Sequence, residues 1–273
     1  MTWEHLEKIF NRSFHHSLSK QKWFLVFPVI ALCSFLGVIC RTIAKASTPW
    51  IQMSLAFLPI FLCAGFLLAV GIVLVRIYHH ELKGERLYYL KTIRNSGKLF
   101  WGISYLAVPL IFAYLILWMI LGVFYLLRAI PAIGEFVGAI LSFGPFLLVL
   151  GSLVLSILSL LILFYITPAA ARKSELRPSI AEEVYGVVKT NPFQAVILPL
   201  FGLLPLFLVG GLLALAAFVT RTMYAAVDSS LFFALRWFLI MLPFSALLTP
   251  AVVFFFNFSA ESYNFIHKKT EKK

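Results

Sequence analysis

Two histidine pairs are the first residues of this chain that suggest chemistry, because imidazole binds metals and exchanges protons near neutral pH. The pairs are His15-His16 and His79-His80, and Glu81 follows the second. Adjacent residues on a helix do not face one another, and neither pair has the spacing of the H-E-x-x-H zinc motif. We therefore expect solvated histidines at a membrane interface and no metal site.

Motifs for nucleophilic catalysis and nucleotide binding are absent from the sequence, which contains no G-x-S-x-G, no G-x-x-x-x-G-K-[ST] and no C-x-x-C. Cys33, Cys40 and Cys63 lie within or at the end of apolar stretches, and an odd number gives no disulfide framework. No catalytic residue, cofactor site or metal ligand is identified. The sequence predicts a protein without enzymatic activity.

Basic residues outnumber acidic ones, 23 to 11, for a net charge of +12. Most of them lie in the first 22 residues, in segments 76–98 and 172–189, and in the C-terminal tail. Anionic lipid headgroups are the simplest partner, at about 1 kcal/mol per basic residue near a membrane surface. Such loops also serve merely to set membrane topology, and nucleic acid is an unnecessary hypothesis. The candidate lipid contacts are Arg76, Lys83, Arg86, Lys91, Arg94, Lys98, Arg172, Lys173 and Arg177.

The elements that must position these residues are membrane helices. Hydrophobic residues make up 62% of the chain and charged residues 12%, against roughly 25% charged in soluble proteins. Crossing a bilayer takes about 20 helical residues, and the runs do not alternate as barrel strands do. We predict an all-α integral membrane protein with six transmembrane helices, at 23–40, 51–75, 99–127, 143–166, 195–219 and 237–258.

The basic segments all fall on one side of these spans, which places both termini in the cytoplasm. A cleaved signal peptide is the alternative at the N-terminus, since Ala44-Lys45-Ala46 has the small-x-small form of a cleavage site. The preceding apolar run is longer than the usual one, so we expect a retained signal-anchor helix. A short outer helix or re-entrant turn is expected at 131–142.

Ion-coupled transport usually requires a charged group within the membrane. We expect all 11 acids in loops or termini, which argues against that class but leaves a facilitator possible at proline-broken helices. The expected helix breaks are Pro59, Pro109, Pro145, Pro199, Pro205 and Pro243. Small residues four apart, among them Gly65 with Ala69 and Gly210 with Ala214, are expected to let helices approach closely.

Three similar blocks divide the single membrane domain 1–273 at 1–80, 81–173 and 174–273. Each has an amphipathic cytoplasmic segment, expected to form a short interfacial helix, followed by a helical hairpin. In the first block, Trp3, Leu6, Phe10 and Phe14 recur at helical spacing. The alternative is that the blocks are not true repeats. They would then look similar only because membrane helices share an apolar composition and often contain proline. A true repeat would give a pseudo-threefold bundle.

One region carries a family resemblance. It contains, in chain order, Ile130-Pro131, Gly134, Ile166-Thr167-Pro168, Leu176, Ser179, Val188-Lys189 and Asn191-Pro192. This pattern resembles a broad group of six-helix bacterial inner-membrane proteins, including the membrane domain attached to some glycerophosphodiester phosphodiesterases and families of unknown function. It covers residues 128–215 in motif and the whole chain in layout. The phosphodiesterase catalytic domain has no counterpart here, so no catalytic residue is carried over.

The expected function is that of a multi-pass bacterial inner-membrane protein acting as a non-enzymatic scaffold or partner in envelope or lipid-linked processes. Its expected partners are anionic lipids, with other proteins or further copies of the chain as additional ones. The alternative is a permease or facilitator for a small or lipophilic solute. An integral-membrane enzyme is the third hypothesis.

Overall fold

The computed structural model describes residues 3–45, 47–84, 108–128, 130, 134–141, 143–172, 186, 189, 192–220 and 231–270. Within them the regular structure is helical, as the sequence predicts. The helices are α1 (Trp3–Ser17), α2 (Lys20–Lys45), α3 (Pro49–Leu82), α5 (Val108–Arg128), α6 (Gly134–Leu141), α7 (Gly144–Arg172), α9 (Pro192–Val219) and α10 (Leu231–Thr270).

Five of these helices, α2, α3, α7, α9 and α10, are long and apolar enough to cross a membrane. The remaining predicted span, 99–127, is described only from Val108 onward, where α5 contains the shorter apolar stretch Val108–Ile120. Large apolar side chains face outward on the spans, such as Phe112 and Leu212, which are 62% and 67% exposed. Such a surface belongs in lipid rather than in water.

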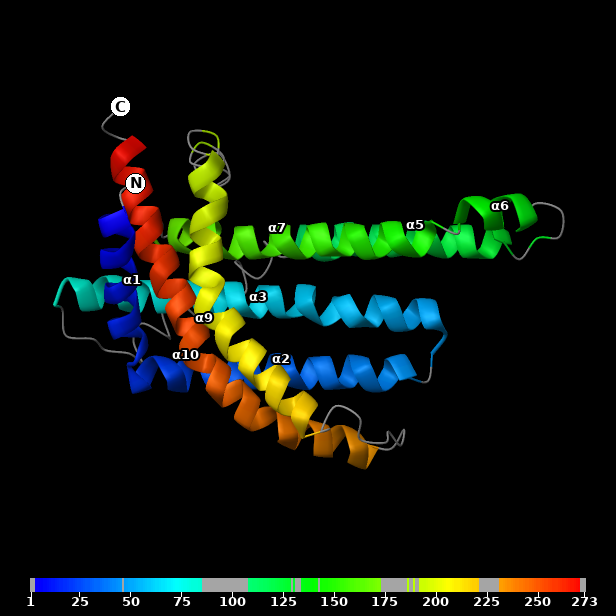
Figure 1. The fold of residues 1–273 in the computed structure, drawn as a ribbon, viewed down its shortest axis with the longest axis horizontal. Helices are drawn as coiled ribbons and strands as arrows, with labels where there is room; N and C mark the ends of the chain where they lie inside the picture. Colours follow the sequence, from blue (N-terminus) through cyan, green and yellow to red (C-terminus); the bar gives the residue numbers. More distant parts are fainter. Residues whose placement is uncertain are drawn as a thin grey trace.

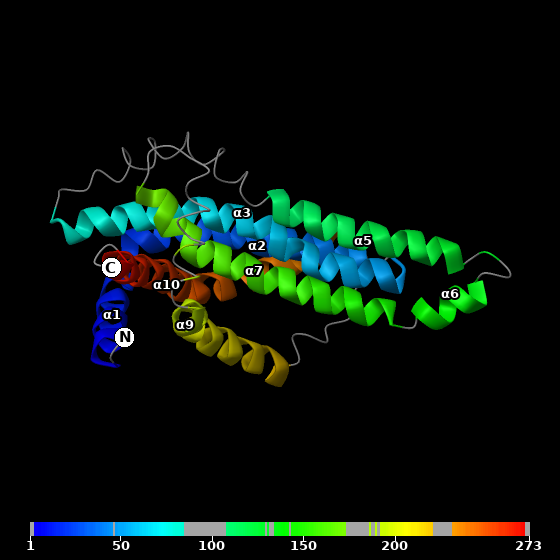
Figure 2. The same ribbon diagram turned by 90° about the horizontal axis from the view of Figure 1, so that it is seen from above.

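The helices form two sets that cross steeply (Figure 1). α2, α3, α5 and α7 run side by side, whereas α9 and α10 cross them diagonally. The view from above shows the same layering, with α9 on the side opposite α5 (Figure 2). Both chain termini lie at one end of the molecule, where α1 runs across the direction of α2 (Figure 1).

The main core lies where α10 crosses the other helices. Phe254, Phe256 and Phe258 of α10 are buried there with Leu68 and Ile72 of α3 and with residues of α7 and α9. α1 belongs to this core as well, because the Phe10 ring lies 4.9 Å from that of Phe254 between centroids. A second cluster, built around Phe61, Tyr114, Trp118 and Leu148, joins α3, α5 and α7.

Glycine determines how closely α3 and α10 approach. A Cβ atom at Gly71 would lie 2.3 Å from Cε1 of the buried Phe256 ring, so the contact requires the absence of a side chain. Gly210 of α9 is different, because a Cβ there would meet no atom within 4 Å. The close packing expected at Gly210 and Ala214 is therefore wrong, and both residues line an open cavity.

Most of the prolines that were expected to break helices lie inside continuous ones. α3 passes through Pro59, α9 through Pro199 and Pro205, and α10 through Pro243. α9 and α10 nevertheless change direction along their length, whereas α3 runs straight (Figure 1). Pro145 is the second residue of α7, a position where the missing N–H has no helical partner to lose. Pro109 holds the same place in α5, and the residues before α5 lie outside the described part.

Successive spans pack as pairs, since α2 contacts α3, α5 contacts α7 and α9 contacts α10. The third pair, however, does not share the direction of the first two (Figure 1). The segments of the second and third blocks that we predict to be cytoplasmic fall almost entirely outside the described residues, so the repeat stays a prediction. α6 occupies the place of the short helix expected at 131–142.

Candidate functional site

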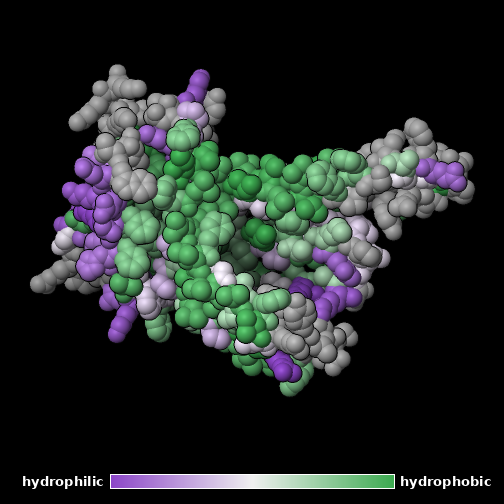
Figure 3. Space-filling model, in the orientation of Figure 1, coloured by the Kyte–Doolittle hydropathy of each residue, from purple (hydrophilic) through white to green (hydrophobic). Residues whose placement is uncertain are grey.

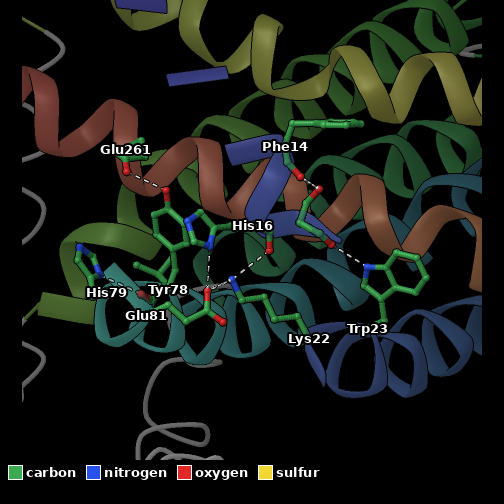
Figure 4. A network of polar contacts seen from close by, with 10 residues as sticks. Phe14, His16, Lys22, Trp23, Tyr78, His79, Glu81 and Glu261 are labelled. Carbon is green, nitrogen blue, oxygen red and sulfur yellow. Dashed lines mark hydrogen bonds and ion pairs between the residues drawn. The ribbon is translucent and has the colours of Figure 1, made fainter. Parts of the chain in front are cut away.

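Six polar residues meet where α1, α2, α3 and α10 come together, and we call this group the polar junction; Figure 4 labels all of them except Arg12. Arg12 and His16 come from α1, and Lys22 comes from α2. Tyr78 and Glu81 come from α3, and Glu261 comes from α10. Lys22 lies near the start of α2, Tyr78 and Glu81 lie near the end of α3, and Glu261 lies nine residues before the end of α10.

Lys22 is the centre of the junction, because its side chain is 0% exposed. Its Nζ atom donates hydrogen bonds to Glu81 Oε2 at 2.6 Å and to the His16 carbonyl oxygen at 3.3 Å. The same ammonium lies 5.1 Å from the centroid of the Tyr78 ring. A buried ammonium requires such compensation, since losing water costs several kcal/mol.

The turn between α1 and α2 directs Lys22 inward. The Lys22 backbone N–H donates to the Ser19 carbonyl oxygen at 3.1 Å. The Trp23 indole Nε1 donates to the carbonyl oxygen of Ser17 at 2.7 Å (Figure 4). Both bonds satisfy groups at the break between the two helices, where regular helical partners are missing. The turn thereby keeps α1 against the bundle.

A second set of contacts ties α10 to the same place. The Tyr78 hydroxyl donates to Glu261 Oε1 at 2.7 Å, and Arg12 Nη1 lies 3.5 Å from the same oxygen. The two carboxylates of the junction, Glu81 and Glu261, thus each face a cation from the first 22 residues. α1 and the start of α2 are therefore held by α3 and α10 together.

His16 joins the two sets. Its Nδ1 atom lies 3.6 Å from Glu81 Oε2, and its ring stands edge-on to Tyr78 at 5.5 Å between centroids. Burial lowers the pKa of His16 below its ordinary value of 6.5 despite the nearby Glu81 carboxylate, and Lys22 lowers it further. Burial thus favours the neutral form of this imidazole.

His79 and Arg172 extend these contacts toward α7. His79 Nδ1 lies 2.8 Å from the Val75 carbonyl oxygen and its Nε2 lies 3.3 Å from Asn264 Nδ2. Arg172 donates to Asn264 Oδ1 and stacks over the Tyr263 ring. His16 and His79 are therefore only partly exposed and contact protein groups, whereas His15 and His80 are exposed.

Three of the nine candidate lipid contacts are described. Arg76 Nε donates to the Ala171 carbonyl oxygen at 3.3 Å, so this guanidinium joins α3 to α7. Arg172 is engaged with Asn264, as above. Lys83 is exposed just after α3, where Gly84 with a φ of 67° ends the helix. The other six lie outside the described residues: Arg86, Lys91, Arg94, Lys98, Lys173 and Arg177.

Sequence reasoning missed the junction because it assigned Glu81 and Glu261 to loops or termini and Lys22 to a basic surface. Both acids instead lie within helices, since α3 continues to Leu82 and α10 to Thr270. One signal was present, because all three charges lie within six residues of a predicted span. Their pairing, however, joins residues far apart in the chain, which local spacing does not encode.

The junction can hold helices together better than it can transform a substrate. The Lys22 ammonium is fully enclosed by protein acceptors and the Tyr78 ring, so a substrate has no access to it. Within the described parts of the chain, no group of three His, Cys, Asp or Glu side chains could hold a metal ion. The geometry is that of a structural connection between four helices.

Comparison with protein-family models, with curated proteins and with solved structures finds no match for this chain. The resemblance to the membrane domain of glycerophosphodiester phosphodiesterases thus stays a prediction. The fold itself defines the class, because the long apolar helices and their outward-facing aliphatic side chains are those of a helical membrane-embedded protein.

Proposed function

We propose that this protein is a six-span inner-membrane scaffold with both termini in the cytoplasm, acting without catalysis. The observation that carries the proposal is the polar junction, which fixes α1 across the end of the bundle through the Arg12–Glu261 ion pair and through the hydrogen bond from the buried Lys22 to the His16 carbonyl oxygen. A scaffold needs a surface held in a constant place, and these contacts from α10 and α2 provide it.

The surface that α1 presents is suited to a charged membrane. Lys8 is exposed on α1, together with the apolar side chain of Phe14, and Leu18 is exposed directly after the helix. Basic residues beside exposed apolar ones are typical of helices that lie in the headgroup region. We infer that α1, with Lys83 and the basic loops, binds anionic headgroups and presents this face to partner proteins.

Lipid retention tests the surface formed by α1 and Lys83, which we call the basic face. The full-length protein is reconstituted into nanodiscs with equal amounts of phosphatidylglycerol and phosphatidylcholine, and the lipids that stay bound are identified by native mass spectrometry. The double variant Lys8→Gln/Lys83→Gln is expected to retain less phosphatidylglycerol, since each charge contributes about 1 kcal/mol. Lys8→Arg/Lys83→Arg is the matched control. Equal retention by all three proteins contradicts the proposed surface.

Topology is tested by labelling. Asp228→Cys, in a background where the three native cysteines are replaced by serine, is expected to react with a membrane-impermeant maleimide added outside intact cells. This position lies in the segment 221–230, which the proposed topology places on the outer side. Labelling only after the cells are opened contradicts cytoplasmic termini.

A permease for a small or lipophilic solute is the second candidate, favoured by the cavities between α2, α9 and α10. Flux in proteoliposomes separates the two functions. The scaffold proposal expects no saturable solute movement above that of protein-free vesicles. Saturable movement of any tested solute would replace the scaffold with the permease.

A further inference from the structure

A groove lies between α2, α9 and α10, at the opposite end of the spans from the polar junction. Two adjoining cavities of about 270 and 250 Å³ form it, and both are lined by Ser34, Arg41, Trp237 and Met241. α10 packs against both α2 and α9, while α2 and α9 have little contact with each other. The space between them is left open, with α10 as its floor.

The α9 side of the groove is lined partly by small residues, which leave it open. Gly210, Ala214 and Ala217 line it from α9, and a Cβ atom at Gly210 would meet nothing within 4 Å. The same holds for Gly37 on the α2 side. The face that carries α9 is visibly hollowed beside this helix, with hydrophobic residues around the hollow and hydrophilic ones toward the α2–α3 turn (Figure 3).

A cation stands at one end of this apolar groove. The Arg41 guanidinium lies over the Trp237 ring, 4.8 Å from its centroid, and no carboxylate of the described residues is within 4.0 Å of it. Lys45, one helical turn further along α2, is also exposed. Arg41 directly follows the predicted span 23–40 and lies about 6 Å along the axis from the end of α2, so the proposed topology puts it at the level of the headgroups rather than of the acyl chains.

The opposite end of the groove offers no free polar group. The Ser34 and Ser245 hydroxyls lie 2.8 Å apart and bond to each other, and Ser245 also donates to the Met241 carbonyl oxygen at 2.9 Å. From Arg41 to Ser34 the groove follows α2 for about 10 Å. A ligand that matches this arrangement has an anionic head at Arg41 and an apolar body extending toward Ser34.

We propose that the groove binds one anionic phospholipid from the surrounding leaflet, with its phosphate at Arg41 and Lys45 and one acyl chain along Gly210 and Ala214. Charge complementarity selects the headgroup, because arginine binds phosphate through paired hydrogen bonds. The groove runs for about 10 Å along α2 between Arg41 and Ser34, and this elongated form suits a single chain. Exposed Leu208 and Leu212 on α9 place lipid directly beside the groove.

Two variants test the head and the chain separately. The full-length protein in detergent is titrated with dioleoyl phosphatidylglycerol or dioleoyl phosphatidylcholine, and bound lipid is measured by native mass spectrometry. Arg41→Gln is expected to weaken phosphatidylglycerol binding about tenfold, the effect of losing one charge-assisted contact. Gly210→Leu is expected to weaken binding of the same lipid at least as much by filling the groove.

Gly211→Leu is the control for Gly210→Leu. Gly211 is the next residue of α9 and does not line the groove, and a Cβ atom added to it would also meet nothing within 4 Å. Both substitutions therefore change the helix backbone alike, and Gly211→Leu is expected to bind lipid as the wild type does. Circular dichroism and gel filtration establish that all the variants are folded before binding is compared.

Location is tested with phosphatidylglycerol that carries a photoreactive diazirine on one acyl chain. Crosslinks are expected at residues 210–217 of α9 and 240–248 of α10, and they should disappear in Gly210→Leu. Equal affinity for the two lipids, unchanged affinity in both Arg41→Gln and Gly210→Leu, or crosslinks confined to other segments would each overturn the proposal. The basic face of the scaffold lies at the other end of the spans, so its failure would leave these results unaffected.

Discussion

The polar junction and the groove each bring a basic side chain of α2 against an aromatic ring, Lys22 against Tyr78 and Arg41 against Trp237. Lys22 is fully buried and bonded to Glu81, whereas Arg41 is exposed and has no carboxylate of the described residues beside it. The first cation is neutralised within the protein, and the second has its charge available to an external anion. One helix thus carries a structural cation at one end and a binding cation at the other.

The largest effect is expected from removing the acid of the junction. Glu81→Gln leaves the Lys22 ammonium buried without its counter-ion, which should destabilise the protein by about 3–5 kcal/mol. Arg41→Gln removes a cation that has no such partner among the described residues, so its effect on stability should be below about 0.5 kcal/mol. Denaturant unfolding in detergent, followed by circular dichroism, measures both.

Replacing the pair together gives the control. Lys22→Met/Glu81→Leu removes both charges and fills similar volume, so the double variant should lose much less stability than Glu81→Gln alone. A double variant as unstable as the single one would show that the contribution of the pair comes from packing rather than from charge.

The next effect compares glycines from the two regions. Gly71→Ala forces a methyl group against the buried Phe256 ring and should cost about 1–3 kcal/mol. Gly37→Ala places the same methyl group in the open groove, where it should not destabilise the helix. Thermal unfolding of the two variants measures this difference in stability. Equal midpoint temperatures for Gly71→Ala and Gly37→Ala would contradict it.

A smaller effect is expected from the ring beneath Arg41. In a double-mutant cycle, Trp237→Leu and Arg41→Gln should show a coupling energy of about 0.5–1 kcal/mol in phosphatidylglycerol binding. Trp237 holds the guanidinium in place, so its loss matters only while Arg41 is present. Strict additivity of the two substitutions would mean that the ring plays no part in recognition.

The smallest effect is that of pH on the junction. Because burial lowers the pKa of His16 in the folded protein, the unfolded chain takes up a proton more readily as pH falls. Stability from this residue is therefore full above pH 6.5 and decreases below it. The stability difference between pH 7.5 and pH 5.5 should shrink in His16→Gln, whereas phosphatidylglycerol binding at the groove should follow no such trend.

The sequence predicted much of the fold because apolar length is a local property. Runs such as 51–75 and 195–219 became α3 and α9, and the short helix α6 lies where one was expected. Helix ends were less predictable, as α10 shows by continuing twelve residues past Phe258 to Thr270. A span predicted from hydropathy ends before charged residues such as Glu261. The helix itself can continue through a charged residue when a neighbouring helix provides an oppositely charged or hydrogen-bonding group.

The two candidate regions escaped prediction for a shared reason. Small residues such as Gly71 and Gly210 look alike in the sequence, yet one meets a phenylalanine ring and the other faces empty space. Likewise, Lys22 and Arg41 are both basic residues of one apolar helix. Lys22 pairs with Glu81 only because the fold brings α2 and α3 together, which the local sequence does not show. Local patterns define which helices form but not what each face meets.

α10 connects the two regions as a single piece of helix. Glu261 belongs to the junction and Trp237 to the groove, and they are separated by roughly 36 Å of helix axis. A helix resists stretching, so an axial displacement of α10 at one end is transmitted to the other unless the helix yields at Pro243 or Pro250. The stiffness of these two proline positions therefore sets how much of a displacement at Glu261 reaches the Trp237 ring beside Arg41.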